Sequence, residues 1–206
     1  SFTIQAKTKT AIVGPTAAGK TQLFYLMSGL AEPTAGDIYI DGKPIHDYNI
    51  NSLLRHIGLV FQDSILFNTT LRDNIAFTNN TNDATLQKAL ETAELGTLVK
   101  ELPKGLNTMV SERGTSLSGG QKQRLMLARA LAVEPQVLLL DDFTARVDQA
   151  TESLILNNVA KNYPDVTLIS ITQKIDPIKD YNKIIVLMEG ELVATGTHQE
   201  LIQSSF

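Results

Sequence analysis

The segment from Gly14 to Thr21 carries residue types that bind phosphate groups. It reads Gly14-Pro-Thr-Ala-Ala-Gly-Lys20-Thr21 and fits the pattern G-x-x-x-x-G-K-S/T, in which backbone N–H groups surround phosphates where a helix begins. In this pattern the lysine reaches the β- and γ-phosphates, and the final hydroxyl binds Mg²⁺. The sequence therefore predicts nucleotide binding by Gly14, Pro15, Thr16, Ala17, Ala18, Gly19, Lys20, Thr21 and Gln22.

Two carboxylates, Asp141 and Asp142, follow an apolar run further along the chain. The run at residues 137–140 is typical of a buried strand, and α/β sheets bind ligands at the carboxyl ends of such strands. Asp141 suits a Mg²⁺ ligand, and Asp142 stands where a carboxylate orients the attacking water in phosphoryl transfer. Taken alone, the pair also fits a solvated turn after a buried strand.

The order of the apolar patterns predicts an α/β scaffold for both motifs. Residues 10–13 form a β-branched run that ends at Gly14, and residues 20–30 have helical spacing, so the loop joins a strand to a helix. This context favours phosphate binding over a glycine turn with a purely structural role. Further helices are expected at residues 86–95, 125–133 and 149–162, and strands at 1–4, 37–41, 57–61, 137–140, 166–171, 183–188 and 191–194, the last two forming a hairpin.

Composition and charge narrow the classes of function. The chain has 206 residues, enough for one large domain or a core with a small subdomain. It carries 18 Lys+Arg against 22 Asp+Glu, so we expect no nucleic-acid partner. It has no cysteine, which excludes disulfides and cysteine-ligated metals. No apolar run reaches the roughly 18 residues of a membrane span, so we expect a soluble chain without direct membrane insertion.

The segment Leu117-Ser-Gly-Gly-Gln121 resembles the signature motif of the ATP-binding cassette (ABC) ATPases. Ser118 and the following glycine N–H groups stand where a helix begins and so form a second anion-binding surface. The resemblance implies that this surface contacts the γ-phosphate of ATP held by an opposite domain, so that function requires a dimer. Its residues would be Leu117, Ser118, Gly119, Gly120 and Gln121. The alternative is a Gly-Gly turn before an ordinary surface helix.

Further segments resemble the exporter branch of the ABC transporters. Residues 60–63 resemble the Q-loop, in which Gln62 would contact Mg²⁺ and the transmembrane domain. Residues 66–77 resemble the exporter segment after the Q-loop, and residues 108–114, including Glu112, resemble the loop that engages coupling helices. The resemblance implies ATP and Mg²⁺ as cofactors, with Thr21, Gln62 and Asp141 as metal ligands, and a location on the cytoplasmic face of a plasma or inner membrane.

The implied fold is a P-loop NTPase (RecA-like) parallel-sheet core with an antiparallel β subdomain and an α-helical signature subdomain at about residues 63–135. We expect residues 1–206 to be one ATP-binding domain that is truncated at its N-terminus, because the family's adenine-stacking aromatic would precede Ser1. The implied partners are a second ABC nucleotide-binding domain and a transmembrane domain that lies outside this chain and selects the transported substrate.

Four motifs of the family depart from the usual pattern in this sequence. Ala17 replaces a glycine of the phosphate loop, and alanine fits only if the backbone there avoids positive φ. Asp142 replaces the glutamate of efficient ATPases; its carboxylate is retracted by roughly 1.5 Å, and a misplacement of ~1 Å can cost on the order of 10²-fold in rate. Gln173 replaces the switch-loop histidine and cannot carry a positive charge. Residues 145–148 keep Asp148 of the dimer-contacting D-loop but alter its neighbours.

These departures predict an ATPase with low intrinsic activity. Asp142, Gln173 and Gln62 would be its catalytic residues, in the degenerate half-site of a heterodimeric exporter, while the intact signature motif would complete a competent site on the partner. The alternative is a nucleotide-binding regulatory or scaffold module that does not hydrolyse ATP. A soluble cassette protein of DNA repair or translation would need long insertions or tandem cassettes, which this sequence lacks.

Overall fold

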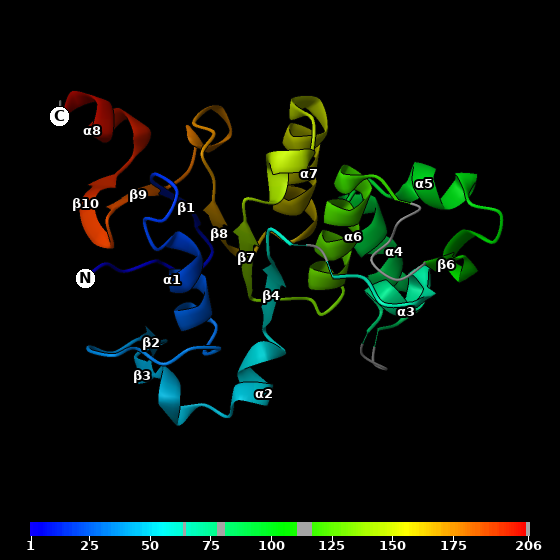
Figure 1. Ribbon diagram of the computed structural model, residues 1–206, viewed down its shortest axis with the longest axis horizontal. Helices are drawn as coiled ribbons and strands as arrows, with labels where there is room; N and C mark the ends of the chain where they lie inside the picture. The colour runs from blue at the N-terminus through cyan, green and yellow to red at the C-terminus, as the bar shows by residue number, and fades with distance from the viewer. Residues whose placement is uncertain (64, 78–80, 111–116, 205–206) are drawn as a thin grey trace.

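The structure is a computed structural model that describes residues 1–63, 65–77, 81–110 and 117–204. At its centre lies a six-stranded sheet with the order β10-β9-β1-β8-β7-β4 (Figure 1). From β9 to β4 neighbouring strands run parallel, and β10 pairs antiparallel with β9. The strands are β1 (Lys9–Val13), β4 (Ile57–Val60), β7 (Val137–Asp141), β8 (Thr167–Ile171), β9 (Lys183–Met188) and β10 (Glu191–Gly196). The α/β class and the closing hairpin are confirmed.

The apolar run on β7 explains its place inside the sheet. A strand covered on both faces needs apolar side chains throughout, and Leu138, Leu139 and Leu140 are at most 2% exposed. Successive side chains point to opposite faces. Leu138 and Leu140 therefore join one core with helices α6 (Gly119–Leu131) and α7 (Gln149–Asn162), and Leu139 joins the other core with α1 (Lys20–Met27).

The remaining elements are short. The helices are α2 (Ile50–Leu54), α3 (Leu71–Ile75), α4 (Asp83–Thr92), α5 (Gly96–Glu101) and α8 (His198–Gln203), with 3-10 turns at Ile45–Asp47, Gly105–Asn107, Phe143–Arg146 (η4) and Asp176–Ile178. Two antiparallel pairs stand apart from the main sheet, β2 (Tyr39–Ile40) with β3 (Lys43–Pro44) and β5 (Thr69–Thr70) with β6 (Met109–Val110). Figure 1 shows α3, α4 and α5 gathered around α6, at the β4 end of the sheet.

The prediction of a strand at residues 1–4 is wrong. Phe2 and Ile4 do pack against the core on the α1 side, as the alternation requires, but the segment forms no ladder. The chain turns at Lys7, whose φ is 59°, and its N–H donates to the Thr167 hydroxyl, so β1 begins only at Lys9. Only Tyr39–Ile40 of the strand expected at 37–41 pairs with another strand. Within the described residues, no helix has both the length and the apolar character needed to cross a membrane.

Candidate nucleotide-binding site

A cleft of about 330 Å³ opens where β1, β7 and β8 end. Its walls come from segments that are far apart in the sequence, namely Thr16, Ala17, Ala18, Gly19, Lys20, Thr21, Gln22, Gln62, Asp141, Asp142, Ile171, Thr172 and Gln173. The fold thus brings together all the residues predicted to be catalytic or to bind the metal, and most of those predicted to bind ATP. Gly14 and Pro15 are not among the lining residues, and their carbonyls accept hydrogen bonds from Lys20.

The phosphate loop places its cation and its backbone donors at the start of α1. Lys20 is 8% exposed, and its Nζ donates to the Gly14 carbonyl at 2.8 Å and the Pro15 carbonyl at 2.7 Å. Among the described residues, no side chain caps the start of α1. The first N–H groups of a helix have no partner within it, so those of α1 are free to bind an anion. A Cβ on Gly14 would lie 2.1 Å from the Leu187 carbonyl oxygen, so only glycine fits there.

Ala17 corrects an expectation. Alanine was expected to fit here only if the backbone avoided positive φ, yet the φ of Ala17 is 66°. The loop keeps the left-handed geometry that suits glycine, and alanine adopts it at a cost of roughly 1–2 kcal/mol. The departure from the family pattern therefore places an alanine in a strained backbone conformation.

Substituting Ala17 with glycine is expected to stabilise the chain. Relief of the left-handed strain, about 1–2 kcal/mol, exceeds the extra entropy that glycine loses on folding, about 0.5–1 kcal/mol. The free energy of unfolding, measured by denaturant titration, should rise by up to about 1.5 kcal/mol. Ala18→Gly is the matched control, because Ala18 is buried at a negative φ and should destabilise the chain when its methyl group is removed. Equal effects of the two substitutions would refute the strain argument.

Thr21 and Asp141 form an oxygen-rich pair beside Lys20. The Thr21 hydroxyl donates to Asp141 Oδ2 at 2.7 Å, and Asp141 is 2% exposed. Burial raises the pKa of Asp141; the Thr21 hydrogen bond opposes this shift, the neighbouring Asp142 adds to it, and Lys20 opposes it. Hydroxyl and carboxylate oxygens are the ligands that Mg²⁺ prefers. Burial disfavours the ionised carboxylate of Asp141, and a bound cation would offset that cost. The residues present therefore fit the predicted metal.

Substituting Asp141 with asparagine is expected to stabilise the nucleotide-free chain while removing Mg²⁺-dependent nucleotide binding. The raised pKa means that the ionised carboxylate is disfavoured in the folded state, so its cost is present above the unfolded pKa and fades as the pH falls. A neutral amide removes that cost, with a gain of roughly 0.5–2 kcal/mol at neutral pH. Thermal unfolding at pH 4 and pH 7, with and without Mg-ATP, checks this. A neutral-pH gain no larger than that at pH 4 would contradict it.

Asp142, Gln173 and Gln62 line the cleft in three different ways. Asp142 adopts φ 44° and ψ 34° at the start of η4, and its N–H donates to the Ile171 carbonyl at 3.0 Å. Left-handed geometry of this kind is tolerated best by asparagine and aspartate among residues with side chains. Gln173 follows β8 with an exposed side chain. Gln62 is held from behind, because its carbonyl accepts a 2.8 Å hydrogen bond from Gln123 on α6.

The signature motif forms a second cleft of about 400 Å³, lined by Ser118, Gly119, Gly120, Arg124, Arg146, Val147, Asp148 and Thr151. The Ser118 hydroxyl accepts from the Gln121 N–H at 3.2 Å, and Gln121 Oε1 accepts from the Ser118 N–H at 2.8 Å, which caps α6. Gln121 is thus engaged in the cap, and Leu117 is buried, so neither lines this cleft. A Cβ on Gly120 would lie 2.7 Å from the Arg146 carbonyl oxygen, so the glycine lets η4 approach α6.

The two clefts share no lining residue among those that the structure describes. Asp148, predicted to contact the partner, lies in the second one, where its carboxylate accepts from the Thr151 N–H at 2.9 Å and caps α7. Hydrogen bonds from Thr151 hold the pKa of Asp148 below its ordinary value, so it is ionised at neutral pH. A phosphate bound by this chain's own phosphate loop therefore does not occupy the signature cleft, which is left available for a phosphate held by another domain.

Comparison with known proteins decides the family. A family model described as ABC transporter matches residues 1–145. The chain belongs to the ABC transporter family. It is also similar over its full length to the solved structure of a bacterial Atm1-family ABC exporter with ATP bound, with a TM-score of 0.95 and 37% identity, covering 100% of this chain and 36% of that one. The P-loop NTPase fold expected from the phosphate loop and the signature motif is confirmed.

Two relatives extend the comparison. The heterocyst differentiation ATP-binding protein HepA of Nostoc sp. is 37% identical over 204 residues, which are 98% of this chain and 34% of that protein. The mitochondrial iron-sulfur clusters transporter ATM1 of Kluyveromyces lactis is 40% identical over 205 residues, 98% of this chain and 28% of that protein. This ABC chain thus spans about a third of the length of its relatives and corresponds to their ATP-binding domain.

Four residues around the clefts could not be assigned from motifs. Gln123 donates to the Gln62 carbonyl, Arg146 lines the signature cleft, and Glu152 on α7 forms an ion pair with Lys174 of the segment after β8. The one available signal was the polar Gln123 on the apolar face of a helix. Residues 111–114 of the predicted coupling-helix loop at 108–114, including Glu112, lie outside the described residues.

Proposed function

We propose that this ABC chain is the ATP-binding motor domain of an exporter, in which two such domains close on ATP and drive transport through a membrane domain. The observation that carries this proposal is the separation of the two clefts on one chain. One cleft holds the loop, the lysine and the carboxylates that nucleotide binding requires, and the other offers the start of α6 to a second nucleotide. Two copies of this geometry, facing each other, complete two sites.

The residues of the first cleft divide the work of phosphoryl transfer. Lys20 exchanges its two carbonyl partners for phosphate oxygens, and the N–H groups at the start of α1 surround the phosphates. Thr21, Asp141 and Gln62 would hold Mg²⁺, and the metal would supply positive charge opposite the negative charge of the phosphates. Asp142 orients the attacking water, and Gln173 donates a hydrogen bond to the γ-phosphate.

We further propose that the first cleft is the degenerate half-site of a heterodimer. Asp142 is one methylene shorter than the glutamate of efficient family members, and neutral Gln173 cannot supply the charge of an imidazolium. Both side chains line the same cleft, so both losses fall on one site, while the capped start of α6 is intact for the partner's nucleotide. The chain would retain ATP in its own cleft and assist hydrolysis in the partner's.

The proposed contact with the membrane domain lies on the face around Phe67. Ile65, Phe67, Phe77 and Met109 are exposed apolar residues, and the rings of Phe67 and Phe77 stack at 5.0 Å. Arg129 supports them from below, with its guanidinium 5.1 Å from the Phe67 ring and its Nε donating to the Asn74 carbonyl at 2.6 Å. We propose that coupling helices dock here, on the cytoplasmic side of a membrane, next to Gln62.

A single-turnover ATPase measurement on the assembled transporter tests the motor role against the alternative of a scaffold that does not hydrolyse ATP. The residue types at Asp142 and Gln173 favour that alternative for this chain's own cleft. We expect this ABC subunit alone to bind ATP and hydrolyse it very slowly, and the complete assembly to turn over ATP. Absence of ATP binding by the subunit would overturn the proposal. Absence of turnover in the assembly, with ATP bound at both sites, would support a scaffold.

A further inference from the structure

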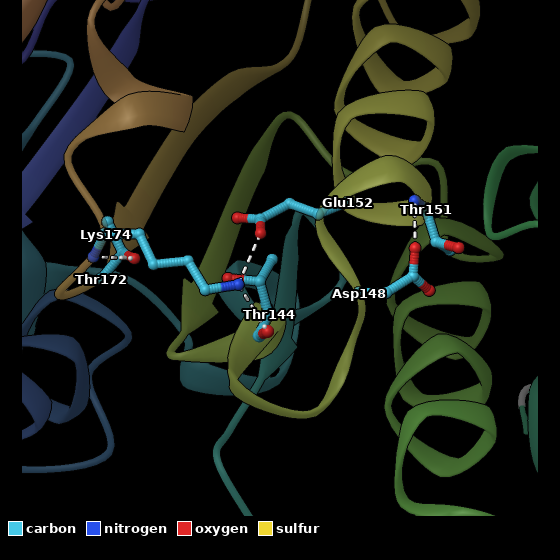
Figure 2. A network of polar contacts seen from close by, with 6 residues as sticks. All are labelled: Thr144, Asp148, Thr151, Glu152, Thr172 and Lys174. Carbon is cyan, nitrogen blue, oxygen red and sulfur yellow. Dashed lines mark hydrogen bonds and ion pairs between the residues drawn. The ribbon is translucent and has the colours of Figure 1, made fainter.

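We propose that the ion pair between Lys174 and Glu152 is a positioning device that transmits closure of the partner domain to Asp142 and Gln173. This inference rests on the proposed function and deepens it. Figure 2 shows the Lys174 side chain reaching from the segment after β8 to the first turn of α7. Its Nζ lies 2.6 Å from Glu152 Oε2 and donates to the Thr144 carbonyl at 3.0 Å.

The pair joins a buried carboxylate to a half-exposed cation. The Glu152 side chain is 2% exposed, whereas that of Lys174 is 42% exposed. Among the described residues, Lys174 is the one cation within ion-pair distance of Glu152. A buried carboxylate left without a cation is strongly unfavourable, so Glu152 holds Lys174 in place and the long lysine side chain is not free to adopt other rotamers.

The contacts of Lys174 join two chain segments that carry residues with a proposed role. Lys174 directly follows Gln173 of the nucleotide cleft, and its N–H donates to the Thr172 hydroxyl at 3.1 Å, which fixes the backbone at this point. Thr144 belongs to η4, the turn that directly follows Asp142. One ammonium group thus ties together the two segments that carry Asp142 and Gln173.

Glu152 connects these segments to the signature cleft. It lies one helical turn after Asp148, which caps α7 through the Thr151 N–H (Figure 2). Asp148 and Thr151 both line the signature cleft, where the partner's nucleotide is proposed to bind. Movement of the first turn of α7 when that cleft fills would carry Glu152, and with it Lys174 and Thr144. A shift of ~1 Å at a reacting group can change rates on the order of 10²-fold, so a small movement suffices.

The experiment compares Lys174→Met, Lys174→Arg and Glu152→Gln in the full-length assembled transporter. Two quantities are measured for this subunit: its affinity for Mg-ATP when the partner's site is empty, and the slowing of ATP release when the partner's site is filled. Lys174→Met should leave the affinity nearly unchanged and remove most of the slowing, a loss of roughly tenfold or more, within the usual range of coupling between sites. Lys174→Arg should preserve the slowing.

If the two residues act as a pair, their substitutions should also be non-additive. Glu152→Gln should reproduce the effect of Lys174→Met, and the double substitution should lose no more slowing than either single one, because both remove the same contact. Slowing that persists in Lys174→Met or Glu152→Gln, or losses that add in the double variant, would overturn the inference. If Lys174→Met does not fold, Glu152→Gln and Lys174→Arg still decide between these results. A wild-type subunit that binds no ATP would instead refute the proposed function.

Discussion

Replacement of Ser118 by arginine is expected to reduce ATP turnover of the assembled transporter by roughly 10²-fold or more, the scale seen when one donor to a developing negative charge is removed. The Ser118 hydroxyl caps α6, and with Gly119 and Gly120 it lines the signature cleft. An arginine side chain would fill this space and bar a phosphate from the N–H groups of α6. ATP binding at this chain's own cleft should change little, because the two clefts share no described residue.

Steady-state ATPase rates and nucleotide crosslinking to this subunit measure the two effects of Ser118→Arg separately. Thr197→Arg is a matched control, since Thr197 forms the same kind of capping box with Glu200 on α8, away from both clefts. Like Ser118→Arg, the Thr197→Arg substitution removes about 1 kcal/mol of helix capping and adds one positive charge. Similar turnover losses in the two variants would assign the effect to helix stability and contradict the role of the signature cleft.

The paired substitution Asp142→Glu and Gln173→His is expected to raise hydrolysis at this chain's own cleft on the order of 10²-fold. Glutamate extends the carboxylate toward the water, and histidine restores a group that can carry positive charge. A stability cost accompanies the gain, because the φ of 44° at residue 142 suits aspartate better than the longer side chain.

Single-turnover hydrolysis measures this gain when the partner's phosphate-loop lysine is replaced, so that only this chain's cleft remains active. Adding Lys20→Met to the pair should abolish the gain, which assigns it to this cleft. An unchanged rate in the paired variant would show that Asp142 and Gln173 do not limit hydrolysis, and the degenerate-site proposal would then fail.

The central helices and strands were predictable because a buried element carries a local, periodic pattern of apolar residues. The helix at 149–162 matches α7, since Asp148 caps its start and periodic apolar residues such as Ile155 and Val159 face the core. α6 begins directly after Ser118, as the signature motif predicted, whereas the apolar period alone starts only at Leu125, because the first turn carries glycine and polar residues. α1 ends at Met27, short of Leu30, because Gly29 adopts a φ of 72°.

Site residues were predictable only where a motif carries them. The phosphate loop and the strand that ends at Asp141 are each a continuous stretch of sequence, and the fold brings the two stretches to one cleft. Contacts such as Gln123 with Gln62, or Lys174 with Glu152, join segments whose proximity is decided by helix packing. The backbone strain at Ala17 could not be predicted either, because the sequence alone does not determine whether a loop residue that replaces glycine adopts a positive φ.

The most direct test of the account follows the γ-phosphate on each subunit. Photocrosslinkable ATP labelled on its α- and γ-phosphates is bound to the assembled transporter, and one turnover is allowed before crosslinking. If this chain's cleft is the degenerate half-site, as proposed, we expect this ABC subunit to retain both labels while the partner retains only the α-label. Loss of the γ-label from this subunit as fast as from the partner would contradict the account.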